Sequence, residues 1–493
     1  MAEELKFLAC DLGAESGRVV LGRLSNDHLR LAEIHRFPNI GVKVGTSLYW
    51  DVLRLFDEMK NGMRSAGLEY GADIASVGID TWGVDFGLLG PNDVLIEIPH
   101  CYRDPRIDGM MEEVFTIIPR SEIYNQTGIQ FMPLNTLYQL YSIRKHNPWM
   151  LNTARTLLMM PDLFNFWFTG VKVCEFTEAT TTQFYNPQKG EWAKPLLERL
   201  SIPTHFLVDI CAPGTILGKL RPSVSEEIGL SDIQLIAPAT HDTGSAVAAV
   251  PAKGKNHVYI SSGTWSLMGV EASEPIINDR ALELNFTNEG GVAGTYRFLR
   301  NIMGLWLVQE CRRTWAQAGN EYSYAELTDL AAKAEPFKHL VDPDDVSFLH
   351  PGDMPGKIRE FCRKTGQPEP ETVGATVRCA LDSLALKYRW VLEGLESLMH
   401  THLEPIHIVG GGTQNKLLCQ LAANVTGRPV VAGPVEATAV GNILIQALAL
   451  GHIGTLEEGR EIVRKSFEVI TYEPQPDDRI EAAYERFKKL LSR

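Results

Sequence analysis

The chain has 493 residues, of which 44% are hydrophobic and 22% charged, and its net charge is −14 at neutral pH. This length exceeds what one core can support, so we expect two or three domains, and the composition excludes disordered and fibrous proteins. The negative charge argues against nucleic acid as a partner but allows a small phosphorylated ligand in a local pocket.

The N-terminus has acidic residues before a short apolar run, which does not fit a signal peptide. No apolar stretch approaches the roughly 18 residues of a membrane helix. The eight cysteines are scattered with no C-x-x-C pair, so a zinc knuckle and a redox motif are excluded and reduced core thiols are expected. We therefore expect a cytoplasmic protein with no membrane partner.

The first predicted element is a hairpin from Lys6 to Leu24, with sequence KFLACDLGAESGRVVLGRL. Its glycine turn lets the backbone approach an anion, and backbone N–H groups, Ser16 and Arg18 supply donors. Asp11 stands where a metal bound to that anion would lie. The pattern predicts a phosphate-binding turn, with an ordinary tight turn as the alternative.

The stretch from Ile74 to Leu89, IASVGIDTWGVDFGLL, predicts a strand, a polar turn and a second strand. Asp80 and Asp85 at this turn are candidates for a general base. Trp82 offers a flat apolar surface for the C–H face of a sugar, or else packs in the core. A helical pattern follows from residue 110 to about residue 170.

A buried strand from Ile233 to Ala239 leads into the sequence THDTGSAVAAV, which predicts a polar loop and a helix of small residues. Asp242 in this loop is the strongest candidate for a base, because α/β proteins place ligands where strands end. The alternative is that Asp242 is a helix N-cap. His241 is either a sugar ligand or a structural histidine.

Residues 251–256, PAKGKN, form the predicted linker, and a second hairpin of the same build follows from Val258 to Val270. Two such hairpins indicate two halves that hold one nucleotide. The segment RNIMGLWLVQE predicts one helix that carries Asn301, Trp306 and Gln309.

Near the end, IHIVGGGTQNKLLCQLAANVTGRPVV predicts a strand, a tight turn of three glycines and a helix that ends at Gly427. The helix opening after these glycines offers free N–H groups and bare backbone for an aromatic base. The last segment, DDRIEAAYERFKKLLSR, predicts an amphipathic helix. The P-loop, Rossmann, G-x-S-x-G and H-E-x-x-H signatures are absent from the sequence.

Together the motifs resemble the FGGY family of carbohydrate kinases. They occur in the family's order and cover most of the chain: DLGAESGR, GIDTWGVDFGLL, ATHDTGSAVAAVP, YISSGTWSLMGVE, TNEGG, RNIMGLW and VGGGTQNKLLCQLAANVTGRPV. The resemblance implies an α/β fold with two actin-like (ribonuclease H-like) domains and an interdomain cleft. Residues 1–250 would then mainly bind sugar, and residues 251–493 would mainly bind nucleotide.

The resemblance also implies residue roles. Asp242 would be the catalytic proton acceptor, and Asp11 would help to hold Mg²⁺ through water. ATP would be contacted by Ala14, Glu15, Ser16, Gly17, Arg18, Thr264, Gln309 and Gly411. Sugar would be contacted by Gly83, His241, Asp242, Thr243 and Asn301. Glu15 departs from the small polar residue that is usual at its turn position.

Within the family, the motifs are most similar to members that phosphorylate L-rhamnulose at O1 with ATP in L-rhamnose catabolism. A family member that acts on L-fuculose, D-xylulose or a polyol would share the phosphate-binding motifs. An actin-like ATPase is the rival from another class, although it has no need for a sugar-sized pocket. The sequence leaves the oligomeric state open.

Overall fold

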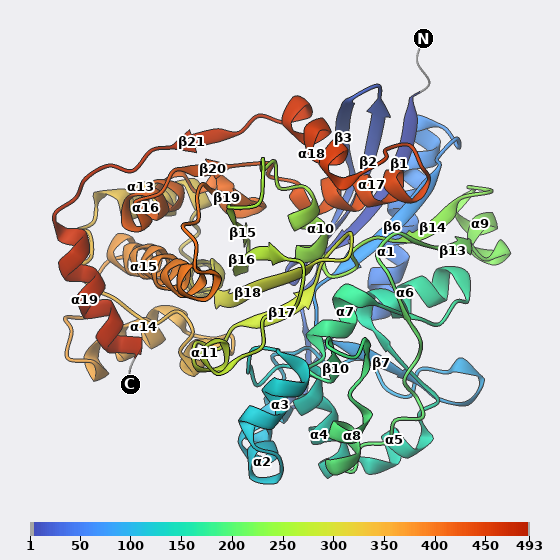
Figure 1. Cartoon of the computed structure of the whole chain (residues 1–493), viewed down its shortest axis with the longest axis horizontal. Helices are drawn as coiled ribbons and strands as arrows, with labels where there is room; N and C mark the ends of the chain where they lie inside the picture. Colours follow the sequence, from blue (N-terminus) through green and yellow to red (C-terminus); the bar gives the residue numbers. More distant parts are fainter. Residues whose placement is uncertain (1–3, 492–493) are drawn as a thin grey trace. The chain divides into compact units, whose positions relative to one another are not determined.

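The computed structural model describes residues 4–491, which fold into two compact units (Figure 1). Unit 1 comprises Met1–Pro251, Glu271–Leu299 and Ala437–Phe467, and unit 2 comprises Ala252–Val270, Arg300–Glu436 and Glu468–Arg493. After residue 251 the chain therefore alternates between the two units, because residues 271–299 and 437–467 belong to unit 1.

Unit 1 is built on a six-stranded mixed sheet in the order β13-β14-β6-β1-β2-β3. Its strands are β1 (Leu5–Leu12), β2 (Ser16–Ser25), β3 (His28–Pro38), β6 (Ser76–Thr81), β13 (Thr215–Lys219) and β14 (Gln234–Ala237). The strands β1, β6 and β14 run parallel, and β2 pairs antiparallel with β1 in the predicted first hairpin. Asp11 lies opposite both Arg18 on β2 and Asp80 on β6.

Four helices pack on this sheet or on one another: α1 (Val52–Tyr70), α10 (Asp242–Ala248), α17 (Ala437–Ala449) and α18 (Leu456–Ser466). In Figure 1 the red helices α17 and α18, from late in the chain, lie beside the blue strands β1 to β3. Glycine permits this close packing. A Cβ atom on Gly441 would lie 1.7 Å from the carbonyl oxygen of Ser245, and one on Gly78 would lie 2.3 Å from Oδ1 of Asn442.

The rest of unit 1 is mostly helical, as predicted for residues 110–170, but a short strand interrupts that region. Its helices are α2 (Met110–Ile117), α3 (Arg120–Thr127), α4 (Thr136–His146), α5 (Pro148–Thr153), α6 (Met160–Thr169), α7 (Phe176–Thr181), α8 (Lys194–Arg199), α9 (Pro222–Ile228) and α11 (Asp279–Glu283). The interrupting strand, β8 (Thr156–Met159), pairs with β7 (Phe86–Leu89), so the strand expected after the Trp82 turn leaves the main sheet.

Small two-stranded pairs complete unit 1. They comprise β4 (Val42–Val44), β5 (Ser47–Tyr49), β9 (Cys174–Glu175), β10 (Tyr185–Asn186), β11 (Glu191–Trp192) and β12 (Ile210–Cys211). Strand β9 leads directly into α7, which Figure 1 shows beneath the end of the main sheet. Glu175 of β9 and Thr177 of α7 hydrogen-bond to the polar loop that precedes α10.

The second sheet has seven strands in the order β17-β18-β16-β15-β19-β20-β21. They are β15 (Val258–Ser262), β16 (Trp265–Ala272), β17 (Thr287–Gly290), β18 (Tyr296–Met303), β19 (Ile406–Val409), β20 (Val430–Ala432) and β21 (Ile470–Tyr472). The predicted second hairpin is β15–β16, and β15 runs parallel to β19. Strand β17 and the ends of β16 and β18 are assigned to unit 1.

The helices of unit 2 are α12 (Trp306–Gln317), α13 (Tyr324–Lys333), α14 (Met354–Lys364), α15 (Val373–Met399), α16 (Lys416–Thr426) and α19 (Arg479–Leu491). The last two confirm the predicted helices near the end of the chain, and Gly427 ends α16 with a left-handed φ of 65°. One expectation was wrong. Asn301 lies on strand β18, and the helix that carries Trp306 and Gln309 begins only after Gly304.

Two further sequence expectations can be compared with the structure. All eight cysteines are free, and all except Cys211 are buried, as expected for core thiols. None of the helices between residues 4 and 491 is both long and apolar enough to span a bilayer.

Candidate functional site

The turn between β1 and β2 holds the residues predicted to contact phosphate. Its backbone is fixed by Asn39, whose side-chain amide donates to the carbonyl oxygen of Gly13 at 2.7 Å and whose N–H donates to that of Glu15 at 2.9 Å. The N–H of Gly13 closes the turn by donating to the carbonyl of Ser16. Residues 13–16 are partly exposed, so this braced turn is accessible to solvent.

Arg18 and Asp11 form an ion pair across this hairpin. Nε and Nη2 of Arg18 donate to Oδ2 of Asp11 at 3.0 and 2.7 Å. The Asp11 side chain is 7% exposed and that of Arg18 is 19% exposed. A carboxylate and a guanidinium therefore lie together at the carboxyl end of β1, in reach of a ligand that approaches the turn.

The three aspartates that sequence analysis considered as bases differ in their burial and hydrogen bonds. Asp85 is buried, and its carboxylate accepts hydrogen bonds from Trp50, Trp82, Gln139 and the N–H of Tyr102. Burial raises the pKa of Asp85 to about 6. With both oxygens engaged by core groups, Asp85 is a structural residue.

Trp82 is likewise a core residue. Its side chain is buried, and its ring packs against that of Trp50 with centroids 4.3 Å apart. The alternative of a packed turn therefore holds in this structure, and the indole provides no exposed surface for a sugar.

Asp80 is fully buried in β6, and Nδ2 of Asn442 on α17 donates to its Oδ2 at 2.6 Å. Burial, followed by the negative charge of Asp11, raises the pKa of Asp80 well above its ordinary value. Because the side chain is enclosed by the sheet and α17, a substrate cannot reach it, so Asp80 is unsuited to the base role.

Asp242 is the aspartate that remains accessible, with 29% of its side chain exposed. It is the first residue of α10 and not its N-cap, which is His241. Thr243 is buried, and its hydroxyl donates to Oδ1 of Asp242 at 3.1 Å. Burial raises the pKa of Asp242, and the nearby charge of Asp11 adds to the rise. Both effects make Asp242 a better proton acceptor than a free aspartate.

The loop that carries Asp242 is held by residues that sequence analysis missed. Oε2 of Glu175 accepts from both the N–H and the hydroxyl of Thr240, at 2.9 and 2.8 Å. The hydroxyl of Thr177 accepts from the N–H of His241 at 3.0 Å. The polar run EFTEATTT after the apolar helix α6 was the signal that could have identified them.

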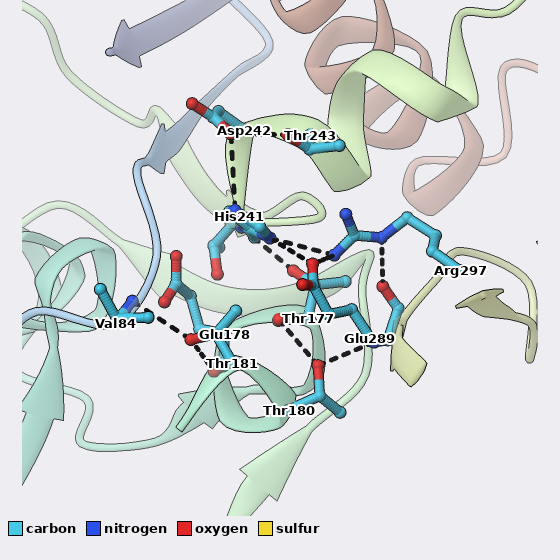
Figure 2. Close-up of polar contacts among 12 residues, drawn as sticks. Val84, Thr177, Glu178, Thr180, Thr181, His241, Asp242, Thr243, Glu289 and Arg297 are labelled. Carbon is cyan, nitrogen blue, oxygen red and sulfur yellow. Dashed lines mark hydrogen bonds and ion pairs between the residues drawn. The ribbon is translucent and has the colours of Figure 1, made fainter. Parts of the chain in front are cut away.

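His241 lies at the centre of a polar group drawn in Figure 2. Nη2 of Arg297 lies 3.0 Å from Nδ1 of His241, and Oε2 of Glu289 lies 3.4 Å from the same nitrogen. Nε2 of His241 faces Asp242, with 3.6 Å between Nε2 and Oδ1. A Cβ atom on Gly83 would lie 3.3 Å from Nε2. The structure thus brings Gly83, His241, Asp242 and Thr243 together in unit 1.

In unit 2 the residues predicted to contact nucleotide surround the ends of two neighbouring strands. The parallel strands β15 and β19 end side by side, and their turns carry Thr264 and Gly411. The carbonyl oxygen of Thr264 accepts from the N–H of Trp306, so the hairpin turn meets the start of α12. Oε1 of Gln309, one turn further along α12, is buried and has no hydrogen-bond partner among the described residues.

The three-glycine turn packs closely on the second hairpin. A Cβ atom on Gly412 would lie 2.0 Å from Oγ of Ser262, whereas one on Gly411 would meet no atom within 4 Å. Gly411 therefore offers open space beside bare backbone, as expected. The glycines do not lead directly into the helix, because a 3₁₀ turn (Gly411–Gln414) intervenes. Asn415 then caps α16, so the N–H of Leu418 is engaged by its side chain.

Asn301, predicted to contact sugar, is buried in β18 of unit 2. Its neighbour Arg300 lies 3.3 Å from Oδ2 of Asp344 and over the ring of Trp390. The buried ammonium of Lys387 pairs with Asp344 at 3.0 Å. Together these charged groups hold the end of β18 in place.

The side chains near the candidate site can also be compared with the ligands that a metal ion requires. Within residues 4–491, no three His, Cys, Asp or Glu side chains form a group that could hold a metal ion by themselves. Mg²⁺ in nucleotide-using enzymes is usually held by one or two carboxylates, phosphate oxygens and water. Asp11, at the turn predicted to contact phosphate, is a carboxylate that fits that smaller requirement.

Models of two domains of the FGGY family of carbohydrate kinases match most of the chain. The N-terminal domain model matches residues 7–249, and the C-terminal domain model matches residues 258–450. A rhamnulokinase from Bacteroides thetaiotaomicron is 46% identical over 485 residues, which cover 98% of this chain and 99% of that protein. A rhamnulokinase from Oceanobacillus iheyensis is 44% identical over 465 residues, which cover 94% of this chain and 97% of that protein.

Solved structures agree on the fold. A ligand-bound xylulose kinase from Lactobacillus acidophilus matches with a TM-score of 0.78 at 16% identity, over 99% of this chain and 97% of that chain. This likeness confirms the expected α/β fold, which the structure builds on two mixed sheets.

Proposed function

Because the chain belongs to the FGGY family of carbohydrate kinases, we propose that it transfers the γ-phosphoryl group of ATP to O1 of L-rhamnulose. The products are L-rhamnulose 1-phosphate and ADP, in a step of L-rhamnose catabolism. The observation that carries this substrate is the 46% identity to a rhamnulokinase over nearly the whole chain. The accessible Asp242 beside the phosphate-binding turn supports the reaction type.

In this reaction Asp242 acts as the general base. As the bond between O1 and phosphorus forms, the O1 proton moves to the Asp242 carboxylate and the bond from phosphorus to the ADP oxygen breaks. The hydroxyl of Thr243 donates to the same carboxylate and holds it in place. Asp242 then loses the proton to solvent before the next turnover.

The turn at Ala14 to Arg18 offsets the charge on the phosphoryl group. Its partly exposed backbone supplies N–H donors, and Arg18 supplies a fixed positive charge. Mg²⁺, when bound with ATP, would neutralise phosphate charge, with Asp11 as the residue that helps to hold it through water.

The two units divide the ligands between them in this proposal. Unit 1 binds the sugar through Gly83, His241, Asp242 and Thr243, and residues 1–250 supply this set. Residues 251–493 mainly bind the nucleotide, through Thr264, Gln309 and Gly411, and the unpartnered Oε1 of Gln309 supports this assignment. Asn301 is proposed as a further sugar contact. We propose a cytoplasmic location, where ATP is available to the reaction.

The test is ADP release by the purified chain with and without sugars. L-Rhamnulose, L-fuculose, D-xylulose and glycerol are each supplied with ATP and Mg²⁺, and ³¹P NMR identifies the phosphorylated carbon. We expect the highest kcat/KM with L-rhamnulose and phosphate at C1. A preference for another sugar would refute the substrate, and ADP release that no sugar stimulates would favour an actin-like ATPase.

A further inference from the structure

We propose that Arg297 is a positioning residue that fixes His241 in the tautomer with its proton on Nε2, so that Nε2 donates a hydrogen bond to an oxygen of the bound ketose. The sugar half of this inference rests on the proposed function, whereas the tautomer concerns the protein alone. Arg297 and His241 are 56 residues apart in sequence, and the structure brings them to 3.0 Å.

The chemistry of the pair determines the direction of the hydrogen bond. A guanidinium carries only donors, so Nη2 of Arg297 donates and Nδ1 of His241 must accept. A neutral imidazole that accepts at Nδ1 carries its proton at Nε2. The nitrogen on the far side of the ring from Arg297 is then a donor.

The fold holds Arg297 rigidly enough for this role. Its side chain is 0% exposed, and its Nε donates to the carbonyl oxygen of Gly290 at 2.7 Å. Arg297 on β18 lies directly opposite Glu289 on β17, and Oε2 of Glu289 lies 3.3 Å from Nη2. The carboxylate offsets the buried positive charge, which would otherwise be costly.

Glu289 offers Nδ1 of His241 an alternative hydrogen-bond partner. Its Oε2 lies 3.4 Å from Nδ1 of His241, so a proton on Nδ1 could be donated to Glu289 instead. That proton would point at Arg297 as well, which can accept no hydrogen bond. The shorter distance, 3.0 Å to Arg297, favours the arrangement in which Nδ1 accepts.

Nε2 of His241 faces the two residues assigned to the sugar. It lies 3.6 Å from Oδ1 of Asp242 (Figure 2). A Cβ atom on Gly83 would lie 3.3 Å from it. A donor at this position selects a ligand oxygen with a lone pair, such as a carbonyl or hydroxyl oxygen. It also cannot accept the O1 proton, which leaves Asp242 as the acceptor.

The first experiment measures the tautomer without any ligand. The chain is labelled with ¹⁵N-histidine, and long-range ¹H–¹⁵N correlation spectra report which ring nitrogen carries the proton; the His241→Gln variant assigns the signals. We expect the His241 ring to carry its proton on Nε2 and none on Nδ1. A proton on Nδ1 in the unchanged protein would overturn the proposal whatever the enzyme's substrate.

The second experiment changes Arg297. In Arg297→Met we expect the Nε2–H tautomer to lose its dominance and the KM for L-rhamnulose to rise about tenfold, the scale of one lost hydrogen bond. The KM for ATP should stay within about twofold, and Arg297→Lys, which keeps a donor, should recover part of the loss. Arg221→Met, which changes a partly buried arginine elsewhere in unit 1, serves as the control.

The Glu289→Gln variant tests which of the two neighbours of Nδ1 sets the tautomer. Because it leaves Arg297 unchanged, its result does not depend on whether the Arg297 variants fold. If Arg297 fixes the ring, His241 keeps its Nε2 proton in this variant. A proton that moves to Nδ1 in Glu289→Gln would refute the role of Arg297. The role would also be refuted if a folded Arg297→Met variant kept both the tautomer and the KM for the ketose unchanged. Activity of the unchanged protein on a different ketose would refute only the substrate.

Discussion

Gly441 on α17 lies so close to Ser245 on α10 that a Cβ atom at residue 441 would stand 1.7 Å from the Ser245 carbonyl oxygen. The two helices therefore meet backbone to backbone, and α10 is the helix that begins with Asp242. The position of the proposed base depends on a glycine that lies 199 residues later in the chain, by the difference between residues 441 and 242.

Gly441→Ala should both destabilise unit 1 and lower kcat. Backbone cannot rotate away from the new methyl group, so we expect a loss of about 3 kcal/mol in the free energy of unfolding, at the upper end for overpacking. Urea unfolding and steady-state kinetics measure the two effects. Gly459→Ala on α18, where the nearest atoms are side-chain methyl groups at 3.3 Å or more, is the control and should change little.

Asp242→Asn should cut kcat by roughly 10²-fold or more, the scale of a lost general base, because an amide cannot accept the O1 proton. The similar size of asparagine should leave both KM values largely intact. Initial rates at saturating ATP and sugar provide the measurement. Turnover close to that of the unchanged enzyme would mean that Asp242 is not the base.

Asp85 should make stability fall as the pH rises from about 4 to about 6. Burial raises its pKa from 3.8 to about 6, so in this window the folded chain keeps a proton that the unfolded chain has lost. Stability present below pH 4 is then lost with rising pH, by roughly 3 kcal/mol over two pH units. The Asp85→Asn variant has no carboxyl group at this position, so its stability should lack this dependence on pH.

Urea unfolding of both proteins across this pH window tests the expectation. Other titrating groups are common to the two, so the difference between their unfolding free energies isolates residue 85. Parallel curves from pH 4 to pH 6 would contradict a raised pKa at Asp85.

Thr264→Ala should raise the apparent KM for ATP more than the KM for sugar. Thr264 lies in the turn between β15 and β16 in unit 2, beside Gln309 and Gly411, which are assigned to the nucleotide. Its carbonyl oxygen, which contacts the start of α12, is retained in the variant, so the loss is confined to the side chain. The opposite pattern would mean that the assignment of the ligands to the two units is reversed.

Local features of the fold could be predicted from the sequence. Each hairpin consists of two apolar runs joined by a turn that contains glycine. Gly427 marks the end of α16 in the sequence. The helix expected over RNIM is a strand instead. Its two polar and two apolar residues are all buried in β18, so the segment shows neither the alternation of a half-buried strand nor a helical spacing.

The candidate site was only partly predictable. Asp242, His241 and Gly83 stand in recognisable motifs, whereas Arg297 reaches His241 only because β17 and β18 pair in one register. Likewise, nothing local to Asn442 shows that it contacts Asp80, 362 residues earlier. Such contacts depend on how distant segments come together, and no local pattern contains that information.

The return of residues 437–467 to unit 1 has a consequence for the order of folding. Helix α17 supplies Asn442 and Gln446, which bond to Asp80 and to the carbonyl oxygen of Leu8 inside the first sheet. During synthesis the first sheet therefore emerges from the ribosome long before the helix that completes its core. Residues 300–436 of unit 2 are made in between. Unit 1, which contains the first residues of the chain, is therefore completed only when residues 437–467 have been made.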